Sequence, residues 1–464
     1  MYKYTNIVNN KNIDLFVILI CSNFKKNIEG LEKKFKLKFP KKLIEYFKTK
    51  KNKFLKQMVG DKLFIISKVN DEKCSKEDLD SSIRNICSSI FQEEKDSKKK
   101  YKVQIVLSPI KSFIRYQVIR TVYHLYDYKK KKNLEITFCG VKNLKKIILN
   151  SVLEGEIINK MRTMVNQPAN IMTTDAFLKN VTQFKKKHLS VEVFDKKKLK
   201  KEKFNLILAV NKGSKQNPYL LTVKWMPNKK EKPIVLVGKG VMFDTGGINI
   251  KLYDFHDMKT DMTGAAVAWS IMKLCAINNL KKNVVALIPL VENMIGPDAQ
   301  RPGDVIESYS GKTVEILNTD AEGRLIMADA LSYSEKFDPK FVVDISTLTG
   351  QAGSIFNNLS IVTLGNYNPL IKSFNETARD MNERTWELPL WNEYRKYLNS
   401  EVADIKNSSE TSSSGTITAA TFLNEFVPKD TKWLHLDIAG VSFKLNSATG
   451  ISILSLYELL KKKH

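Results

Sequence analysis

Between residues 233 and 364, short apolar segments alternate with segments of helical pattern, and this alternation constrains the fold more than any other feature. The segment Pro233–Val237 is apolar at every position, which is typical of a strand buried on both faces of a parallel sheet. Strands that alternate with helices predict a mostly parallel sheet with crossover connections. We expect strands at 233–237, 284–291, 313–317, 341–346 and 361–364, and helices at 263–276 and 321–337.

The residues before this region predict a smaller α/β domain with no recognisable chemical motif. Apolar runs indicate strands at 15–21, 63–69, 103–107 and 134–139, and apolar spacing indicates a helix at 114–126. We therefore expect an α/β chain with a smaller N-terminal α/β domain (1–150), a linking helix (151–166) and a larger α/β domain (167–464) with a mostly parallel central sheet. The run 15–21 is far shorter than the roughly 20 residues of a membrane span, so we expect no membrane association.

The cysteine and histidine content limits both the compartment and the kind of metal site. The 5 cysteines include no CxxC pair, and the 5 histidines include no HxH or HxxxH pair. An odd number of unpaired cysteines argues against a disulfide framework, and we expect a cytoplasmic protein. Any metal ion would have to be held mainly by carboxylates.

The net charge of +27 is concentrated in the first half of the chain, where lysines form short runs such as 98–100, 129–132 and 196–198. A basic surface can attract nucleic acid through counterion release. However, base recognition favours arginine, and only 9 of the 76 basic residues are arginines. We read these lysines mainly as a solvated surface, and nucleic acid stays open as a secondary partner.

Three segments place charged residues at the ends of buried elements. Lys239 follows the apolar strand directly, Asp244 lies in the glycine-rich segment after it, and Asp261, Asp320 and Glu322 lie beside expected helices. Taken singly, Asp261 and Asp320 could be helix N-caps, and the glycine-rich segment with Asp244 could be a tight turn. Taken together, carboxylates that are brought close repel one another unless cations hold them. The pattern therefore favours a site for two divalent ions that share bridging carboxylates.

These segments resemble the leucine aminopeptidase (cytosol aminopeptidase) family, two-metal enzymes that remove N-terminal residues from peptides. The matching segments are VGKGVMFDTGGINIK at 237–251, MKTDMTGAA at 258–266, RPGDV at 301–305, NTDAEGRL at 318–325 and STLTG at 346–350. Further short matches include HLDIAG at 435–440, and the resemblance covers roughly residues 155–460. In this family a smaller α/β domain precedes the catalytic domain.

The resemblance implies a metal-ligand set. Lys239, Asp244, Asp261 and Glu322 would hold the tightly bound ion, with Lys239 as a neutral amine. Asp244, Asp320 and Glu322 would hold the exchangeable ion, so that Asp244 and Glu322 bridge the two. The two ions would be Mn²⁺ or Zn²⁺, and a metal-bridged hydroxide would attack the scissile carbonyl.

The resemblance also implies the remaining site residues and the assembly. Lys251 and Arg324 would be catalytic, with Lys251 stabilising the oxyanion and a bicarbonate held at Arg324 taking the proton. Leucine and other apolar N-terminal residues would be preferred, in a pocket formed by Met258, Thr347, Leu348 and Gly350. Members of the family are homohexamers, and we expect the same here.

Three features depart from the family pattern or from ordinary composition. Gln351 replaces a usual alanine, the stretch 253–257 is polar and one residue short, and Ser408–Ser414 is rich in serine. The first two lie at the expected pocket rim and bear on side-chain preference. Alternative functions are a two-metal phosphoesterase, a nucleic-acid-binding protein and an inactive relative of the aminopeptidases. Phosphoesterases usually add histidines to such sites, and these motifs contain none.

Overall fold

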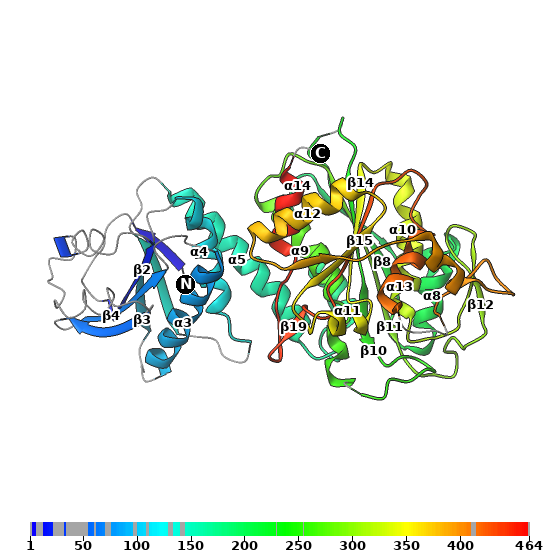
Figure 1. Cartoon of the computed structure of the whole chain (residues 1–464), viewed down its shortest axis with the longest axis horizontal. Helices are drawn as coiled ribbons and strands as arrows, with labels where there is room; N and C mark the ends of the chain where they lie inside the picture. Colours follow the sequence, from blue (N-terminus) through cyan, green and yellow to red (C-terminus); the bar gives the residue numbers. More distant parts are fainter. Residues whose placement is uncertain are drawn as a thin grey trace. The chain divides into compact units, whose positions relative to one another are not determined.

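The computed structural model of the chain describes most of its residues and divides it into two compact units, 1–159 and 160–464. The described residues are 2–5, 13–21, 32–33, 54–59, 62–69, 76–95, 100–107, 111–128, 133–139, 144–228, 230–253, 255–409 and 414–462 (Figure 1). Lys98, Lys99, the run 129–132, Asp254 and the part of the serine-rich segment at 410–413 lie outside them.

The first unit contains a six-stranded sheet in its described part, in the order β1-β6-β5-β2-β4-β3. All neighbours are parallel except β3 and β4. The bounds are β1 Tyr2–Thr5, β2 Leu15–Cys21, β3 Phe54–Val59, β4 Lys62–Val69, β5 Tyr101–Val106 and β6 Leu134–Cys139, with helices α3 Lys76–Lys95, α4 Lys111–His124 and α5 Lys145–Asn166. The four expected strands are therefore confirmed to within two residues. The expected helices at 114–126 and 151–166 both begin earlier than predicted.

The second unit is built on a larger sheet, which has nine strands in the described part of the chain. Its path is β16-β15-β18-β14-β9-β11-β8-β7, and β10 also pairs with β11. The central pairs are parallel, while β7, β8 and β15 pair antiparallel toward the edges. The strands are β7 Leu189–Phe194, β8 Tyr219–Trp225, β9 Ile234–Gly238, β10 Gly240–Asp244, β11 Val284–Asn293, β14 Phe341–Ser346, β15 Ile361–Gly365, β16 Thr385–Glu387 and β18 Trp433–Asp437. The mixed α/β fold with a mostly parallel central sheet is confirmed.

Helices cover both faces of this sheet, as Figure 1 shows for α9 and α14 on one side and α10 and α13 on the other. Their bounds are α6 Thr174–Thr182, α7 Lys196–Lys201, α8 Asn205–Val210, α9 Thr263–Ile277, α10 Glu322–Tyr333, α11 Gly350–Ile355, α12 Asn368–Asp380, α13 Gly415–Asn424 and α14 Ile453–Lys461. Short strands β12 Val305–Glu307, β13 Thr313–Glu315 and β17 Ile405–Lys406 form a separate three-stranded sheet. None of the described helices is long and apolar enough to cross a membrane.

Two expected boundaries were wrong. The strand predicted at 313–317 ends at Glu315, although Ile316 is buried in the core and its amide donates to the carbonyl of Asp304. The helix predicted at 321–337 changes at Ser334 to a short 3₁₀ turn that ends at Phe337. The helix predicted at 263–276 is confirmed, and residues 263–276 are all buried.

Close packing of α9 against the sheet depends on two glycines. A Cβ on Gly238 would lie 2.6 Å from the carbonyl oxygen of Gly264, and a Cβ on Gly264 would collide with the carbonyl of Ile345. Contacts this short exclude any larger residue at either position. The two glycines thus let the helix start next to the ends of β9 and β14, where Lys239 emerges from the sheet.

Candidate active site

The charged residues singled out in the sequence come together at the carboxyl ends of the central strands. β9 leads into Lys239, β10 ends at Asp244, and Asp261 lies two residues before α9. Asp320 and Glu322 lie where α10 begins. They line one cavity of about 640 Å³, together with every other site residue expected from the sequence: Lys251, Met258, Arg324, Thr347, Leu348 and Gly350. The carboxyl edge of a parallel sheet is where α/β folds bind ligands.

Lys239 is nearly inaccessible and is surrounded by acceptors. Its Nζ lies 2.7 Å from Asp261, 3.1 Å from Oε1 of Glu322 and 3.0 Å from the carbonyl oxygen of Thr347. Burial alone would lower the pKa of Lys239, but the charges of Asp261 and Glu322 raise it above its usual value. In the protein alone, this lysine therefore neutralises part of the negative charge of the cluster.

Lys251 neutralises the other two carboxylates of the cluster, Asp244 and Asp320. Its Nζ lies 2.7 Å from Oδ2 of Asp244 and 2.5 Å from Oδ1 of Asp320. Two glycines with positive φ, Gly246 at 87° and Gly247 at 65°, fold the preceding loop back on itself. The loop closes with a bond from the Lys251 amide to the carbonyl of Thr245, at 2.9 Å. This turn brings the ammonium back toward the end of β10.

The cluster holds more carboxylates than cations. Two lysines face four carboxylates, and candidate ligand atoms of Asp244, Asp320 and Glu322 all lie within 4.8 Å of one another. Burial, together with the charges of Asp244 and Glu322, raises the pKa of Asp320 to about 7. Burial also raises the pKa of Asp244 and of Asp261. Such an excess of buried negative charge is what bound cations relieve.

The orientation of Glu322 supports the same interpretation. Its residue is 1% exposed, and its Oε2 is buried without a hydrogen-bond partner. Burial would raise the pKa of Glu322, but the charges of Lys239 and Lys251 outweigh that effect and lower it. A charged carboxylate oxygen left without a bond in a closed site is costly. The residues present therefore fit divalent ions with oxygen-rich coordination.

The helix-cap interpretation of these aspartates was wrong. The N-cap of α9 is Met262 and that of α10 is Ala321, and neither helix start has a side-chain cap bond. Asp261 instead bonds Lys239 and accepts from the Thr347 hydroxyl at 2.8 Å. Both aspartates are thus committed to the cluster and not to the helix ends.

Arg324 lines the same cavity and has no carboxylate hydrogen-bond or ion-pair partner among the described residues. Its Nη1 donates to the carbonyl oxygen of Asn407 at 2.7 Å, and its buried Nε has no acceptor. Burial lowers the pKa of Arg324 to about 10. A guanidinium with an unused donor in a polar cavity can bind a planar anion.

Several residues that organise the site had no assigned role in the sequence analysis. Asn293 donates from its amide to Asp244 at 2.8 Å and to the carbonyl of Thr319 at 3.1 Å. Asn407 donates to the carbonyl of Asn318 at 2.7 Å. Asp437 accepts a hydrogen bond from the backbone amide of Leu348 at 3.2 Å. The segment HLDIAG at 435–440 was the available signal for Asp437, but all of these side chains act only through contacts with distant segments.

The expected departure at Gln351 lies on the wall of the cavity. Gln351 also lines a neighbouring cavity of about 380 Å³ whose other walls include Ile355, Leu388 and Ile417. Its Oε1 accepts from the amide of Thr416 at 3.3 Å. Gln351 therefore separates the charged cavity from a mainly apolar one.

Comparison with known proteins agrees with this geometry. The model of the cytosol aminopeptidase family, catalytic domain, matches residues 159–457. A probable cytosol aminopeptidase of Phytoplasma australiense is 40% identical over 353 residues, which is 73% of this chain and 71% of that protein. A probable cytosol aminopeptidase of Chlorobaculum tepidum is 38% identical over 396 residues, 81% of this chain and 78% of that protein.

Solved structures show the same fold over nearly the whole chain. A tomato leucine aminopeptidase variant matches with a TM-score of 0.84 at 23% identity, covering 99% of this chain and 96% of that chain. The bottromycin maturation enzyme BotP in complex with Mn matches with a TM-score of 0.83 at 23% identity, covering 97% and 99%. The likeness therefore extends beyond the 299 residues of the catalytic-domain match into the first unit.

Proposed function

The chain belongs to the cytosol aminopeptidase family, and from that premise we propose how its own residues carry out the reaction. It is a metal-dependent hydrolase of the leucyl aminopeptidase type, which removes N-terminal residues from peptides. The observation that carries the proposal is the single cavity in which four carboxylates and two lysines meet.

Two divalent ions, Mn²⁺ or Zn²⁺, fit the carboxylate excess. Lys239, Asp244, Asp261 and Glu322 would hold one ion, and Asp244, Asp320 and Glu322 the other. When bound, the ions would supply the nucleophile by lowering the pKa of a coordinated water toward neutrality. Lys239 must then give up its proton, because only a neutral amine can coordinate a metal, and a nearby dication makes that loss favourable.

Lys251 stabilises the charge that develops on the substrate. In the protein alone it is held between Asp244 and Asp320, whose charges keep its pKa above the usual value although burial opposes them. It therefore remains a cation in this setting. A fixed ammonium beside the scissile carbonyl favours the tetrahedral oxyanion over the ground state.

Arg324 supplies an anion site rather than a base. An arginine does not act as a proton acceptor near neutral pH, and the lining of the cavity, all of it within the described residues, contains no histidine. We propose that the unused Nε of Arg324 would hold a bicarbonate, which would supply the base for the nucleophilic water. The bond to Asn407 fixes the guanidinium for that role.

The substrate's N-terminal side chain lies against Met258 and the segment 347–350, which line the same cavity. Methionine adapts well to flexible apolar side chains. We therefore propose leucine and other apolar residues as the preferred N-terminal residues. The polar residues Asp257, Asn358 and Ser442 also line the cavity, so part of its wall is polar.

We propose a homohexamer located in the cytoplasm. Large apolar side chains are exposed in the second unit, among them Ile355, Leu359, Trp386, Trp391 and Val402. Burying them between copies would be favourable. Residues 251–464 carry a net charge of −4, whereas residues 1–250 carry +31, so the second half can pack against itself without strong repulsion. Light scattering should give six times the 53.1 kDa mass of one chain.

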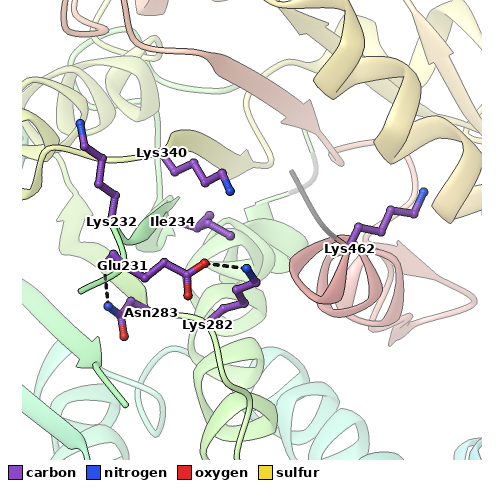
Figure 2. A pocket seen from close by; sticks show the side chains of 7 residues that line it. All are labelled: Glu231, Lys232, Ile234, Lys282, Asn283, Lys340 and Lys462. Atoms are coloured by element: carbon purple, nitrogen blue, oxygen red, sulfur yellow. Dashed lines mark hydrogen bonds and ion pairs between the residues drawn. The ribbon is translucent and has the colours of Figure 1, made fainter. Parts of the chain in front are cut away.

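The lysines that cluster in the second unit do not favour nucleic acid as a partner. Figure 2 shows four of them around a small pocket at the amino end of β9, with Lys232 and Lys462 directed away from its centre. Lys282 is paired with Glu231 at 2.6 Å, and Lys232 is paired with Asp338 at 2.7 Å. The cluster is therefore partly neutralised.

The proposal is tested with purified protein loaded with Mn²⁺ or Zn²⁺. Hydrolysis of L-leucyl, L-alanyl and L-lysyl chromogenic amides is compared with that of N-acetyl-leucyl amide and of a phosphodiester. We expect rapid hydrolysis of the leucyl amide and none of the acetylated amide, because the free α-amine is required. Hydrolysis of the phosphodiester in place of the amides would establish the two-metal phosphoesterase instead.

A further inference from the structure

Asp437 lies at the carboxyl end of β18, beside the loop that follows β14. It is 1% exposed. Its Oδ1 accepts from the amides of Leu348 at 3.2 Å and Ala439 at 3.1 Å. Its Oδ2 accepts from the amide of Thr349 at 3.1 Å and from the hydroxyl of the same residue at 2.8 Å. Both oxygens are thus fully used, and all their donors belong to loop segments.

The loop that Asp437 holds is the one that borders the catalytic cavity. Thr347 accepts from Lys239 through its carbonyl at 3.0 Å and donates from its hydroxyl to Asp261 at 2.8 Å. Leu348 and Gly350 line the cavity directly. One side of the loop therefore contacts the charged cluster and the substrate space. The other side is held by the carboxylate of Asp437, with one further contact between the hydroxyls of Thr349 and Thr416 at 2.7 Å.

A second buried carboxylate nearby serves as a comparison. Asp344 lies on β14, is completely buried, and bonds the ring nitrogen Nδ1 of His435 and the indole of Trp433, each at 2.7 Å. These bonds join β14 to β18 within the sheet, and none of them reaches the loop. Asp344 and Asp437 thus match in charge and burial, but only Asp437 contacts the substrate-binding loop.

We propose that Asp437 is a positioning residue that sets the 347–350 loop against the substrate's N-terminal side chain. The inference rests on the proposed aminopeptidase function and assigns Asp437 no contact with substrate. Catalytic sites lose efficiency when a supporting group lets the geometry shift by about 1 Å. Asp437 prevents such a shift by binding two successive amides and a hydroxyl of the loop.

The substitution Asp437→Asn removes this function while keeping the shape of the side chain. An asparagine amide has one acceptor oxygen and one donor nitrogen. The substitution replaces one of the two carboxylate oxygens by an amide nitrogen, which is a donor. That nitrogen would face backbone amides that are themselves donors. Either Thr349 or the pair Leu348 and Ala439 would lose its partner, and the loop would move.

The experiment measures kcat and KM of the metal-loaded enzyme for leucyl and alanyl amides in Asp437→Asn and in the matched control Asp344→Asn. We expect Asp437→Asn to raise KM for the leucyl amide and to lower the leucyl-to-alanyl preference in kcat/KM roughly 10-fold or more. Asp344→Asn should reduce thermal stability but leave both quantities within about twofold, because it does not touch the loop.

A second pair of variants keeps the test decisive if Asp437→Asn does not fold. Thr349→Val removes the hydroxyl bonded to Asp437, whereas Thr349→Ser keeps it. We expect a smaller change of preference, in the same direction, in the valine variant alone. Equal effects of Asp437→Asn and Asp344→Asn, or of the two Thr349 variants, would overturn the positioning role. A wild-type enzyme that cleaves neither amide would instead contradict the proposed function.

Discussion

Each unit of the molecule contains a buried cluster of charged side chains, and the two clusters differ in whether carboxylates are in excess over their cationic partners. In the first unit, one carboxylate, Asp80, joins α3 to α4. It is bonded by Arg120, by His124 at 3.0 Å and by Arg84 at 3.4 Å. In the second unit, four carboxylates share two lysines.

The pKa values of the acids follow this difference. Burial would raise the pKa of Asp80, but the hydrogen bond from His124 and the charge of Arg120 hold it well below its usual range. In the second unit, burial and neighbouring carboxylates raise the pKa of Asp320 to about 7. A buried cluster that balances its own charge joins elements together, whereas one with surplus carboxylates is suited to binding cations. Burial and distance alone do not distinguish the two.

The largest effect is expected from Glu322→Gln, which removes the carboxylate between the two lysines. The variant should lose essentially all turnover and bind less metal, because a neutral amide is a poor ligand for a shared ion. Metal content by mass spectrometry and turnover of leucyl amide measure both effects. Glu315→Gln, on β13 outside the cavity, is the control. Normal metal content and turnover in Glu322→Gln would remove the contrast between the clusters.

The next effect separates the two lysines of the second cluster. Lys251→Ala should lower turnover roughly 100-fold, the scale of losing one oxyanion donor, and leave metal content nearly unchanged. Lys239→Ala should instead weaken metal binding, with activity partly restored at high metal concentration. Metal titration of turnover distinguishes the two variants. The opposite pattern, with metal lost only in Lys251→Ala, would reverse the roles we propose.

Asp80→Asn tests the balanced cluster in the first unit. Removing the charge leaves Arg120 and His124 without their anion, and breaking a buried ion pair costs about 3 kcal/mol of stability. Because the folded pKa of Asp80 is lowered, its contribution is present above the unfolded pKa of about 4 and is lost as pH falls through the folded value.

Thermal unfolding followed by circular dichroism from pH 7 to pH 2 measures this effect. The wild type should be the more stable protein at pH 7, and the difference should narrow below pH 4. At pH 7, the metal content of the second unit should be the same in Asp80→Asn as in the wild type. A difference that is constant across this range would mean that Asp80 stabilises the unit through its shape and not through its charge.

The sequence predicted the strands and site residues that a local pattern marks. It missed the roles of residues that depend on contacts with distant segments. The strand β9 is a continuous apolar run and β14 begins with one, and both were expected within one residue. The residues Lys239 and Asp320 stood out because charge directly beside a buried element is rare. Residues such as Asp437 gave no comparable signal, since their partners lie 88 and 89 positions away and are brought close only by the pairing of β14 with β18.

The smallest effect is expected from a charge pair that belongs to neither cluster. Lys198 contacts Glu192 at 2.7 Å, but their side chains are 38% and 40% exposed. Water screens such a pair, so Lys198→Gln should change stability by no more than about 0.5 kcal/mol and leave turnover unchanged. Chemical denaturation, with Lys198→Arg as the control that keeps the charge, measures the difference. A loss of unfolding free energy comparable to that of Asp80→Asn would show that burial does not determine how much a charge contributes to stability in this protein. The comparison of the two buried clusters would then have no basis.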